Sequence, residues 1–329
     1  MKTNLIFIGI DVSKSILDIY VLTCGESRPY RIANQSKAIR DFFIERLKVD
    51  QHCHICMENT GKYGWTLMGI LCELSCHFYV VNPLHLHRSL GLIRGSDDPV
   101  SALRIAQFIK KNYDQLTPYI PRRAVVESLH LLVCERSYKV KQRRGLKTKN
   151  KDLQVLPCTE VSQSLMVKND ELILQLTLQI KAIEAQIKDL IREDDKLHSL
   201  EQHLRSVPGV GEILAWNVLI KTNEFISITE PRKLACYAGV APFSKRLGTS
   251  VFGRSRVSLC ADKSLKKLLH LAAMSAIRLE NDLSVFYHRK VKEGKNKMSV
   301  LNAVRNKIIH IIFALVKNQT FYQNRLVVS

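Results

Sequence analysis

The feature that most constrains the fold is an apolar segment near the N-terminus that ends in a carboxylate. Residues Leu5–Ile10 form a run rich in β-branched side chains, Asp11 follows it, and a second apolar run covers Ile16–Leu22. This pattern predicts a buried strand that carries an acid to its tip, followed by a turn and a second strand. Gly9, two residues before the acid, predicts a position where backbone or ligand approaches closely.

An acid in this position has two interpretations. A carboxylate at the end of a central strand is a common first ligand for Mg²⁺ in nucleases and polynucleotidyl transferases. The reason is that Mg²⁺ binds hard oxygen ligands, which carboxylates and phosphates both supply. Alternatively, the segment is a β-hairpin whose Asp11 faces solvent. Taken by itself, the segment favours the hairpin.

The charge of the chain indicates what kind of partner it has. Its 329 residues include 50 Lys and Arg against 30 Asp and Glu, a formal net charge of +20. This excess favours a polyanion, through phosphate neutralisation and counterion release. A membrane surface would also attract it, but there is no apolar run of about 18 residues and no signal-peptide pattern. We therefore expect DNA or RNA as the partner, no membrane, and a cytoplasmic protein.

The nine cysteines lie at irregular spacings, which is typical of reduced thiols. Cys53 and Cys56 have the C-x-x-C spacing of many zinc sites, and Cys72 and Cys76 follow. However, Cys53 and Cys56 lie in an apolar strand-like run, where alternation places them on opposite faces. This placement disfavours zinc.

The order of segments predicts an α/β region followed by long helices. Residues 1–125 alternate strand-like and helix-like stretches, which is typical of a layered α/β fold. Residues Ile173–Leu197 then carry apolar side chains on an a/d pattern. This predicts a long amphipathic helix, either a coiled coil, which would imply self-association, or an antiparallel helical stalk. A helix packed on its own domain is the remaining alternative.

A run of cations between residues 139 and 151 predicts contact with phosphates. The run contains no acid and consists of Lys139, Lys141, Arg143, Arg144, Lys147, Lys149 and Lys151. Such a run is also found in linkers and on solvated helix faces, but seven like charges in a strongly basic chain favour a nucleic-acid backbone.

Two glycine-containing segments of the C-terminal half predict further contacts with nucleic acid. Ser206-Val-Pro-Gly-Val-Gly211 joins two helix-like stretches in the manner of a helix–hairpin–helix. There, Gly209 and Gly211 would form a tight turn whose N–H groups face a phosphate at a helix N-terminus. A basic loop follows, and we expect four of its cations to approach a bound strand: Lys245, Arg246, Arg254 and Arg256.

In this order the segments resemble one family, the IS110 type of bacterial insertion-sequence transposases, also called bridge recombinases, with the related Piv-type DNA invertases. The resemblance covers nearly the whole chain. It rests on Asp11, on an acid-x-Thr-Gly-x-Tyr motif at residues 58–63, and on the family's Asp-x-x-Asp-Ala motif, which reads Asp-x-x-Ser-Ala at 98–102 here. It also rests on Val-Pro-Gly-Val-Gly at 207–211, on Ala-Gly-x-x-Pro at 238–242, and on the family's Ser-Gly-Thr-Ser motif, which reads Leu-Gly-Thr-Ser at 247–250 here.

The resemblance implies a domain order. A RuvC-like domain of RNase H fold would cover residues 1–150, a coiled-coil connector 151–200 and a mainly α-helical transposase domain 201–329. It also implies that Asp11, Glu58 and Asp98 are catalytic Mg²⁺ ligands. A serine would attack the phosphate and hold the cleaved strand, and an RNA encoded by the element would guide the protein to donor and target DNA. The protein would act as a homo-oligomer, a dimer or a tetramer, in the bacterial cytoplasm.

The chain departs from the family pattern at two positions. Ser101 stands where the third motif has its second acid, and Leu247 stands where the family has its nucleophilic serine. Asp97 is adjacent to Asp98 and would point elsewhere in a regular segment. Ser244 and Ser250 lie three residues to either side of Leu247. Whether either replaces the missing nucleophile is open.

Three hypotheses follow. The first is an active DNA transposase or recombinase. The second is a catalytically decayed copy that acts only as a DNA- or RNA-binding protein. The third is a RuvC-type junction resolvase, against which the long helix and the C-terminal motifs argue, because a resolvase needs neither.

Overall fold

The computed structural model describes residues 5–90, 98–156, 159–247, 251–257 and 261–324. The chain forms two compact units, Met1–Pro121 and Arg122–Ser329. The predicted boundary at residue 150 falls inside a helix of the second unit, α5 (Ala124–Val155), which packs against α6 (Glu160–Glu193). The cation run between residues 139 and 151 thus lies within one continuous helix.

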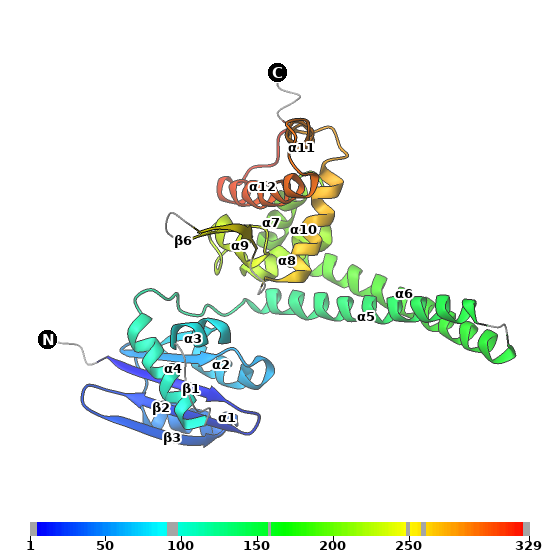
Figure 1. Cartoon of the computed structure of the whole chain (residues 1–329). Helices are drawn as coiled ribbons and strands as arrows, with labels where there is room; N and C mark the ends of the chain where they lie inside the picture. Colours follow the sequence, from blue (N-terminus) through cyan, green and yellow to red (C-terminus); the bar gives the residue numbers. More distant parts are fainter. Residues whose placement is uncertain (1–4, 91–97, 157–158, 248–250, 258–260, 325–329) are drawn as a thin grey trace. The chain divides into compact units, whose positions relative to one another are not determined.

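A five-stranded mixed sheet forms the centre of the first unit, in the order β3-β2-β1-β4-β5 (Figure 1). β1 pairs antiparallel with β2 and β2 with β3, whereas β4 and β5 run parallel to β1. The strands are β1 (Ile6–Val12), β2 (Ile16–Leu22), β3 (Ser27–Ala33), β4 (Cys53–Glu58) and β5 (His77–Val81). The predicted strand–acid–strand segment is therefore the β1–β2 hairpin, and β1 lies at the centre of the sheet.

Helical segments cover both faces of this sheet, which explains why its central strands are apolar on both sides. They are α1 (Ser36–Arg40), a π-helical segment (Asp41–Arg46), a 3₁₀ turn (Gly61–Gly64), α2 (Trp65–Cys72), α3 (Pro83–Leu90) and α4 (Asp98–Asn112). The face with Ile8 and Cys53 packs against α1, the π-helical segment and α2. The face with Phe7 and Cys56 packs against α4, so Cys53 and Cys56 do lie on opposite faces.

Helix α4 approaches the sheet most closely at Gly9. A Cβ at Gly9 would lie 2.2 Å from the carbonyl oxygen of Ala102. Just beyond the C-terminal end of α4, the ring of Tyr113 lies 5.3 Å from that of Phe7, centroid to centroid. Helix α4 therefore runs antiparallel to β1, and its N-terminal end points toward the end of β1 that carries Asp11.

Two long helices, α5 and α6, pair antiparallel in the second unit (Figure 1). The predicted a/d stripe of α6 faces α5, with Ile180 and Ile187 buried. Polar contacts recur at steps of seven residues, as expected of a heptad register. They join Arg136 Nε to Glu184 (2.7 Å), Arg143 Nη1 to Thr177 (3.2 Å) and Asn150 Nδ2 to Asp170 (2.8 Å).

The remaining elements of the second unit are helices, which pack around the fully buried Trp216, and one antiparallel pair of strands. They are α7 (Asp195–Arg205), α8 (Glu212–Thr222), α9 (Pro231–Tyr237), β6 (Phe243–Leu247), β7 (Val251–Arg256), α10 (Lys263–Ala276), α11 (Asp282–Lys292) and α12 (Lys297–Asn318). Among the described helices, α12 has the length and apolar composition of a membrane span. However, its residues Val304, Ile308 and Ile312 lie in the core of this unit.

Ion pairs of one arginine join the start of α5 to the end of α6 and to the turn after α8. Three consecutive residues after α8 adopt left-handed backbone: Asn223 (φ 49°), Glu224 (φ 55°) and Phe225 (φ 65°). Such a run is strained for residues with side chains. Arg123, just before α5, donates to the fully buried Glu224 (Nε–Oε2, 2.8 Å) and to Asp194 between α6 and α7 (Nη1–Oδ2, 2.8 Å). The hydrogen-bonded pairs hold the strained turn in place.

Replacing Gly9 tests the close approach of α4. Because the added Cβ would meet helix backbone, Gly9→Ala is expected to destabilise the first unit by about 1–3 kcal/mol or more, measured by urea unfolding. Gly69→Ala in α2 is the control. A Cβ there meets nothing within 4 Å, so alanine should stabilise the helix by about 0.5–1 kcal/mol. Unchanged stability of Gly9→Ala would contradict the packing described above.

Candidate functional site

The carboxyl ends of β1 and β4 bring together two of the predicted metal ligands. Asp11 is the penultimate residue of β1, and Glu58 is the last residue of β4. The parallel register pairs Ile10 with Met57, so Asp11 and Glu58 occupy equivalent positions on adjacent strands. Because side chains alternate along a strand, both lie on the sheet face that α4 covers.

The third predicted ligand, Asp98, is the first residue of α4. It precedes Ala102 by about 6 Å along the helix axis, and Asp11 lies about 6–7 Å beyond Gly9 along β1. Since Ala102 lies over Gly9, the start of α4 reaches the end of the sheet that carries Asp11. The side chain of Asp98 is outside the described part of the chain. Ser101, in the first turn of α4, is partly buried.

Asp18 is a further carboxylate beside this site, and it had no role among the sequence predictions. It lies directly opposite Asp11 in the β1–β2 register, and opposite residues of an antiparallel pair share a face. Asp18 is buried, however, and Arg31 Nε lies 3.5 Å from its carboxylate. We assign Asp18 to the support of the site. The signal was in the sequence, because the short turn after Val12 sets this register.

The donor set fits a hard divalent cation. Asp11 and Glu58 present carboxylate oxygens, the ligands that Mg²⁺ prefers. Among the side chains that the structure describes, no three Asp, Glu, His or Cys residues converge as a metal site, and Asp98 is not among those side chains. The described part of the unit therefore offers two candidate ligands, and the start of α4 lies at the same end of the sheet.

The cysteines are poor candidates for zinc. Burial raises the pKa of the Cys56 thiol to about 12. Burial, followed by the nearby thiols of Cys53 and Cys72, raises the pKa of Cys76 to about 11. Zinc is bound by thiolates, and these pKa values favour the neutral thiol. Together with the separation of Cys53 and Cys56 by the sheet, they argue against a zinc site here.

The predicted phosphate-binding run lies on α5, one helix of the α5–α6 pair. Lys139 pairs with Glu135 at 3.3 Å, and Arg143 bonds to Thr177, so these two are partly buried in helix contacts. Five cations of the run are exposed, and the structure pairs none of them with an acid of the described chain: Lys141, Arg144, Lys147, Lys149 and Lys151. Helical spacing places Lys141, Arg144, Lys147 and Lys151 on one face, about 15 Å long.

The two glycines of the turn between α7 and α8 differ in how closely other atoms approach them. Gly209 has φ +84°, and a Cβ there would lie 2.2 Å from the carbonyl oxygen of Ala272 in α10. Gly209 is thus required for packing of the helices. Gly211 is exposed, precedes α8, and has open space around it. Glu212 begins α8 and pairs with Lys188 and Arg205, so a carboxylate already occupies the neighbourhood of this helix end.

The β6–β7 hairpin carries the C-terminal signature. Leu247 ends β6 and pairs with Val251 of β7. The side chains of residues 243–247 and 251–256 are outside the described part, as is Ser250, so the roles of Ser244, Ser250 and the four loop cations stay predictions. The base of the hairpin is fixed by Asp262, which accepts from Tyr237 (3.2 Å), pairs with Lys221 (3.0 Å) and caps α10.

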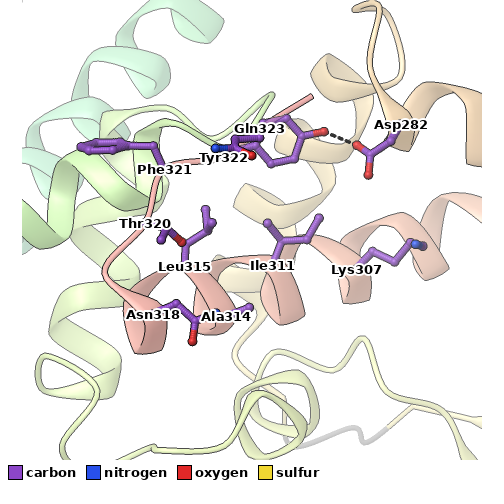
Figure 2. Close-up of a pocket in the computed structure, with 10 residues that line it drawn as sticks. All are labelled: Asp282, Lys307, Ile311, Ala314, Leu315, Asn318, Thr320, Phe321, Tyr322 and Gln323. Atoms are coloured by element: carbon purple, nitrogen blue, oxygen red, sulfur yellow. Dashed lines mark hydrogen bonds between the residues drawn. The ribbon is translucent and has the colours of Figure 1, made fainter. Parts of the chain in front are cut away.

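A pocket of about 670 Å³ lies between α12 and the segment that follows it. Figure 2 shows Tyr322 turned toward Asp282, to which its hydroxyl donates a hydrogen bond. The walls are formed mostly by the last turns of α12 and by residues 320–323, with Lys307 as the lining cation. The pocket therefore lies where the C-terminal segment folds back on its own unit, and it has no cluster of chemical groups suited to catalysis.

Two family profiles match the chain. Residues 8–158 match a transposase profile of the DEDD, IS110 type, and residues 201–288 match the profile described as transposase, IS116/IS110/IS902 family. The first covers the sheet with Asp11, Glu58 and Asp98, together with α5. The second covers the α7–α8 turn and the β6–β7 hairpin.

Similar proteins agree with these profiles. The chain is 25% identical to the pilin gene-inverting protein of Moraxella lacunata, over 97% of this chain and 98% of that protein. Its counterpart in Moraxella bovis is 24% identical over the same shares. A 43.6 kDa protein of insertion element IS110 from Streptomyces coelicolor is 31% identical, over 45% of this chain and 35% of that protein. The chain therefore belongs to the IS110/IS116/IS902 family of transposases.

Proposed function

We propose that the chain cleaves and rejoins DNA strands in a Mg²⁺-dependent reaction, as the transposase or site-specific recombinase of an insertion sequence, guided by an RNA that the element encodes. The observation that carries this proposal is the convergence of Asp11, Glu58 and the start of α4 at one end of the sheet. The names of the Moraxella relatives, pilin gene-inverting proteins, support inversion of a DNA segment as a related reaction.

The sheet would position the ligands for this chemistry. Mg²⁺, when bound, would neutralise charge on the scissile phosphate and stabilise its in-line displacement. Asp11 and Glu58 are fixed by the parallel pairing of β1 and β4, so their separation is set by the strand spacing. In the cleavage step a hydroxyl oxygen bonds to phosphorus while the bond from phosphorus to a deoxyribose oxygen breaks. The number of phosphoester bonds is unchanged, so rejoining needs no outside energy source.

The exposed stripe on α5 supports nucleic-acid binding. Four cations spaced along one helix face can each approach a phosphate, and every phosphate neutralised releases counterions. Both partners proposed for this chain, element DNA and guide RNA, present phosphates at suitable spacing. Contacts to phosphates position a nucleic acid without reading its sequence, so such a stripe is compatible with specificity supplied by base pairing of an RNA.

Exposed apolar side chains on α6 support a homo-oligomer, a dimer or a tetramer. Leu172, Leu174 and Leu178 are 47%, 62% and 58% exposed, although they lie on a helix whose other side packs against α5. A second α5–α6 pair could cover them by the same seven-residue packing, as in a coiled coil.

A second candidate function, a catalytically decayed copy that only binds DNA or RNA, is favoured by two residues. Leu247 offers no nucleophilic atom at the position of the family serine, and Ser101 offers no carboxylate at the start of α4. Loss of a covalent nucleophile lowers the rate by orders of magnitude. Both residues lie at element ends, so neither change disturbs the core, and such a copy would keep its fold and its cationic surfaces.

The metal site is tested without relying on activity. Mg²⁺ is expected to raise the melting temperature of the full chain, because a ligand that binds only the folded state stabilises it. Asp11→Asn and Glu58→Gln should each weaken Mg²⁺ binding by at least about 10–100-fold, read from the Mg²⁺ dependence of melting. Glu26→Gln, an exposed acid of the same unit, should leave it unchanged. An identical Mg²⁺ response in all four proteins would exclude this site.

Neutralising the stripe tests the nucleic-acid surface. The variant with Lys141, Arg144, Lys147 and Lys151 changed to Gln should bind DNA more weakly. The slope of log K against log salt should shrink by up to about 0.9 for each lost phosphate contact. Binding is measured by fluorescence anisotropy at several salt concentrations. Changing Lys168 and Lys181 on α6, which are also exposed, is the control. A slope unchanged by the four substitutions would remove this stripe from the interface.

Restoring the family residues decides between the two candidate functions. Leu247→Ser combined with Ser101→Asp should increase strand exchange if the copy has decayed. The assay is a plasmid carrying the element's ends, with its RNA and Mg²⁺, and a denaturing gel that detects covalent protein–DNA adducts. An adduct with the unchanged chain would show that another residue is the nucleophile. No gain in the restored, folded, nucleic-acid-bound protein would argue against decay at these two positions.

A further inference from the structure

Helix α12 buries an arginine that has no acidic partner in the described chain. Arg305 is only 7% exposed. Its Nη2 lies 2.7 Å from His270 Nδ1 on α10, and its Nη1 donates a long hydrogen bond, 3.4 Å, to Asn302 Oδ1. Its buried Nε has no hydrogen-bond partner. A guanidinium has five N–H donors, and two of them are used here.

Four elements on this side of the second unit contain no carboxylate. Helices α9, α10 and α12 have no Asp or Glu in their sequences, and residues 243–256 of the β6–β7 hairpin have four Lys and Arg and no acid. Burial lowers the pKa of Arg305, and no carboxylate opposes this effect. A buried charge without a counter-charge is strongly destabilising. Arg123, by contrast, donates hydrogen bonds to two carboxylates.

His270 is arranged to accept from Arg305. Burial, followed by repulsion from Arg305, lowers the pKa of His270, which favours the neutral imidazole. A neutral ring that accepts at Nδ1 carries its proton on Nε2 and can donate there. Because His270 is only partly buried, its Nε2–H can donate to a group at the protein surface.

Two asparagines complete the cluster and connect it to the hairpin. Asn302 Nδ2 donates to the carbonyl oxygen of Val240 at 2.7 Å, three residues before β6. Asn306 lies one turn after Asn302 on the same helix face, and its buried Oδ1 has no partner. Both asparagines keep some solvent exposure. Unpartnered buried polar atoms are few in native proteins and call for a cause such as a missing ligand. Of the two here, only the Nε–H of Arg305 can donate to an anion, because Asn306 Oδ1 is an acceptor.

We propose that Arg305, His270 and Asn302 form an anion site at the foot of the β6–β7 hairpin, and that this site takes a phosphodiester of the nucleic-acid strand. A guanidinium binds phosphate oxygens through paired N–H groups, and the phosphate supplies the counter-charge that the fold lacks. The inference rests on the proposed function only for the source of the phosphate. Arg305 lies outside the segments matched by the family profiles.

The anion site is tested first with inorganic phosphate and the full chain. At matched ionic strength, phosphate should raise the melting temperature above that in chloride, by about 3–6 °C at about ten times the Kd. Arg305→Gln should abolish this difference. Its melting temperature in chloride should equal or exceed that of wild type, because the uncompensated charge is gone. Lys317→Gln, an exposed cation of the same helix, should keep the phosphate effect.

The nucleic-acid assignment is tested with the same proteins and a single-stranded DNA oligonucleotide. Arg305→Gln should raise the Kd about 10-fold or more, the loss expected for a charged hydrogen bond, and Lys317→Gln should change it little. Should Arg305→Gln fail to fold, Arg305→Lys replaces it. Lysine keeps the charge but cannot present two parallel N–H groups, so most of the phosphate effect should still disappear.

The outcomes separate this site from the proposed function. No phosphate-specific effect in wild type, or an effect that survives substitution of Arg305, would overturn the anion site and leave the metal site and the α5 stripe untouched. A lost phosphate effect with unchanged DNA affinity would overturn the phosphodiester assignment alone. A wild-type protein that binds no DNA would contradict the proposed function, and the phosphate measurement would then decide the anion site by itself.

Discussion

The contact between Gly9 and the backbone of α4 is the constraint on which the candidate active site depends. With no side chain at this position, the helix lies directly against the central strand, at a distance that any Cβ would prevent. The contact fixes where α4 begins relative to the end of β1. The positions of Asp11, Glu58 and Asp98 near one another follow from this packing and from the parallel pairing of β1 with β4. Neither the acids nor the strands alone would assemble the site.

Charge is distributed in the second unit in two contrasting ways. Where helices meet in the interior, Arg123 is matched by Glu224 and Asp194, and the pairing holds a strained turn. On the exposed face of α5 and around Arg305, cations are left without acids. In the first arrangement the charges are paired within the protein. In the second the cations lack acidic partners, and a bound polyanion can supply the counter-charge. These cations contribute to the net charge of +20 and are the ones proposed to meet nucleic acid.

Sequence reasoning succeeded where a pattern reports a local period. The strand–turn–strand of β1 and β2, the separation of Cys53 from Cys56 across the sheet, and the long amphipathic helix α6 are confirmed. It did not locate the end of the first unit. The boundary at residue 150 that the resemblance implied lies within α5, because a helix can continue past the point where a sequence motif ends.

The order of residues along the chain was enough to identify the family, the acids at strand ends and the cation-rich segments, because motifs and charge runs can be recognised in the sequence alone. Which groups become neighbours was settled by folding. Packing placed Gly209 against the backbone of α10, while Gly211 stayed open. It also buried Arg305 among acid-free helices. The physical reason is that burial and pairing depend on contacts between segments far apart in the sequence, which no local period encodes.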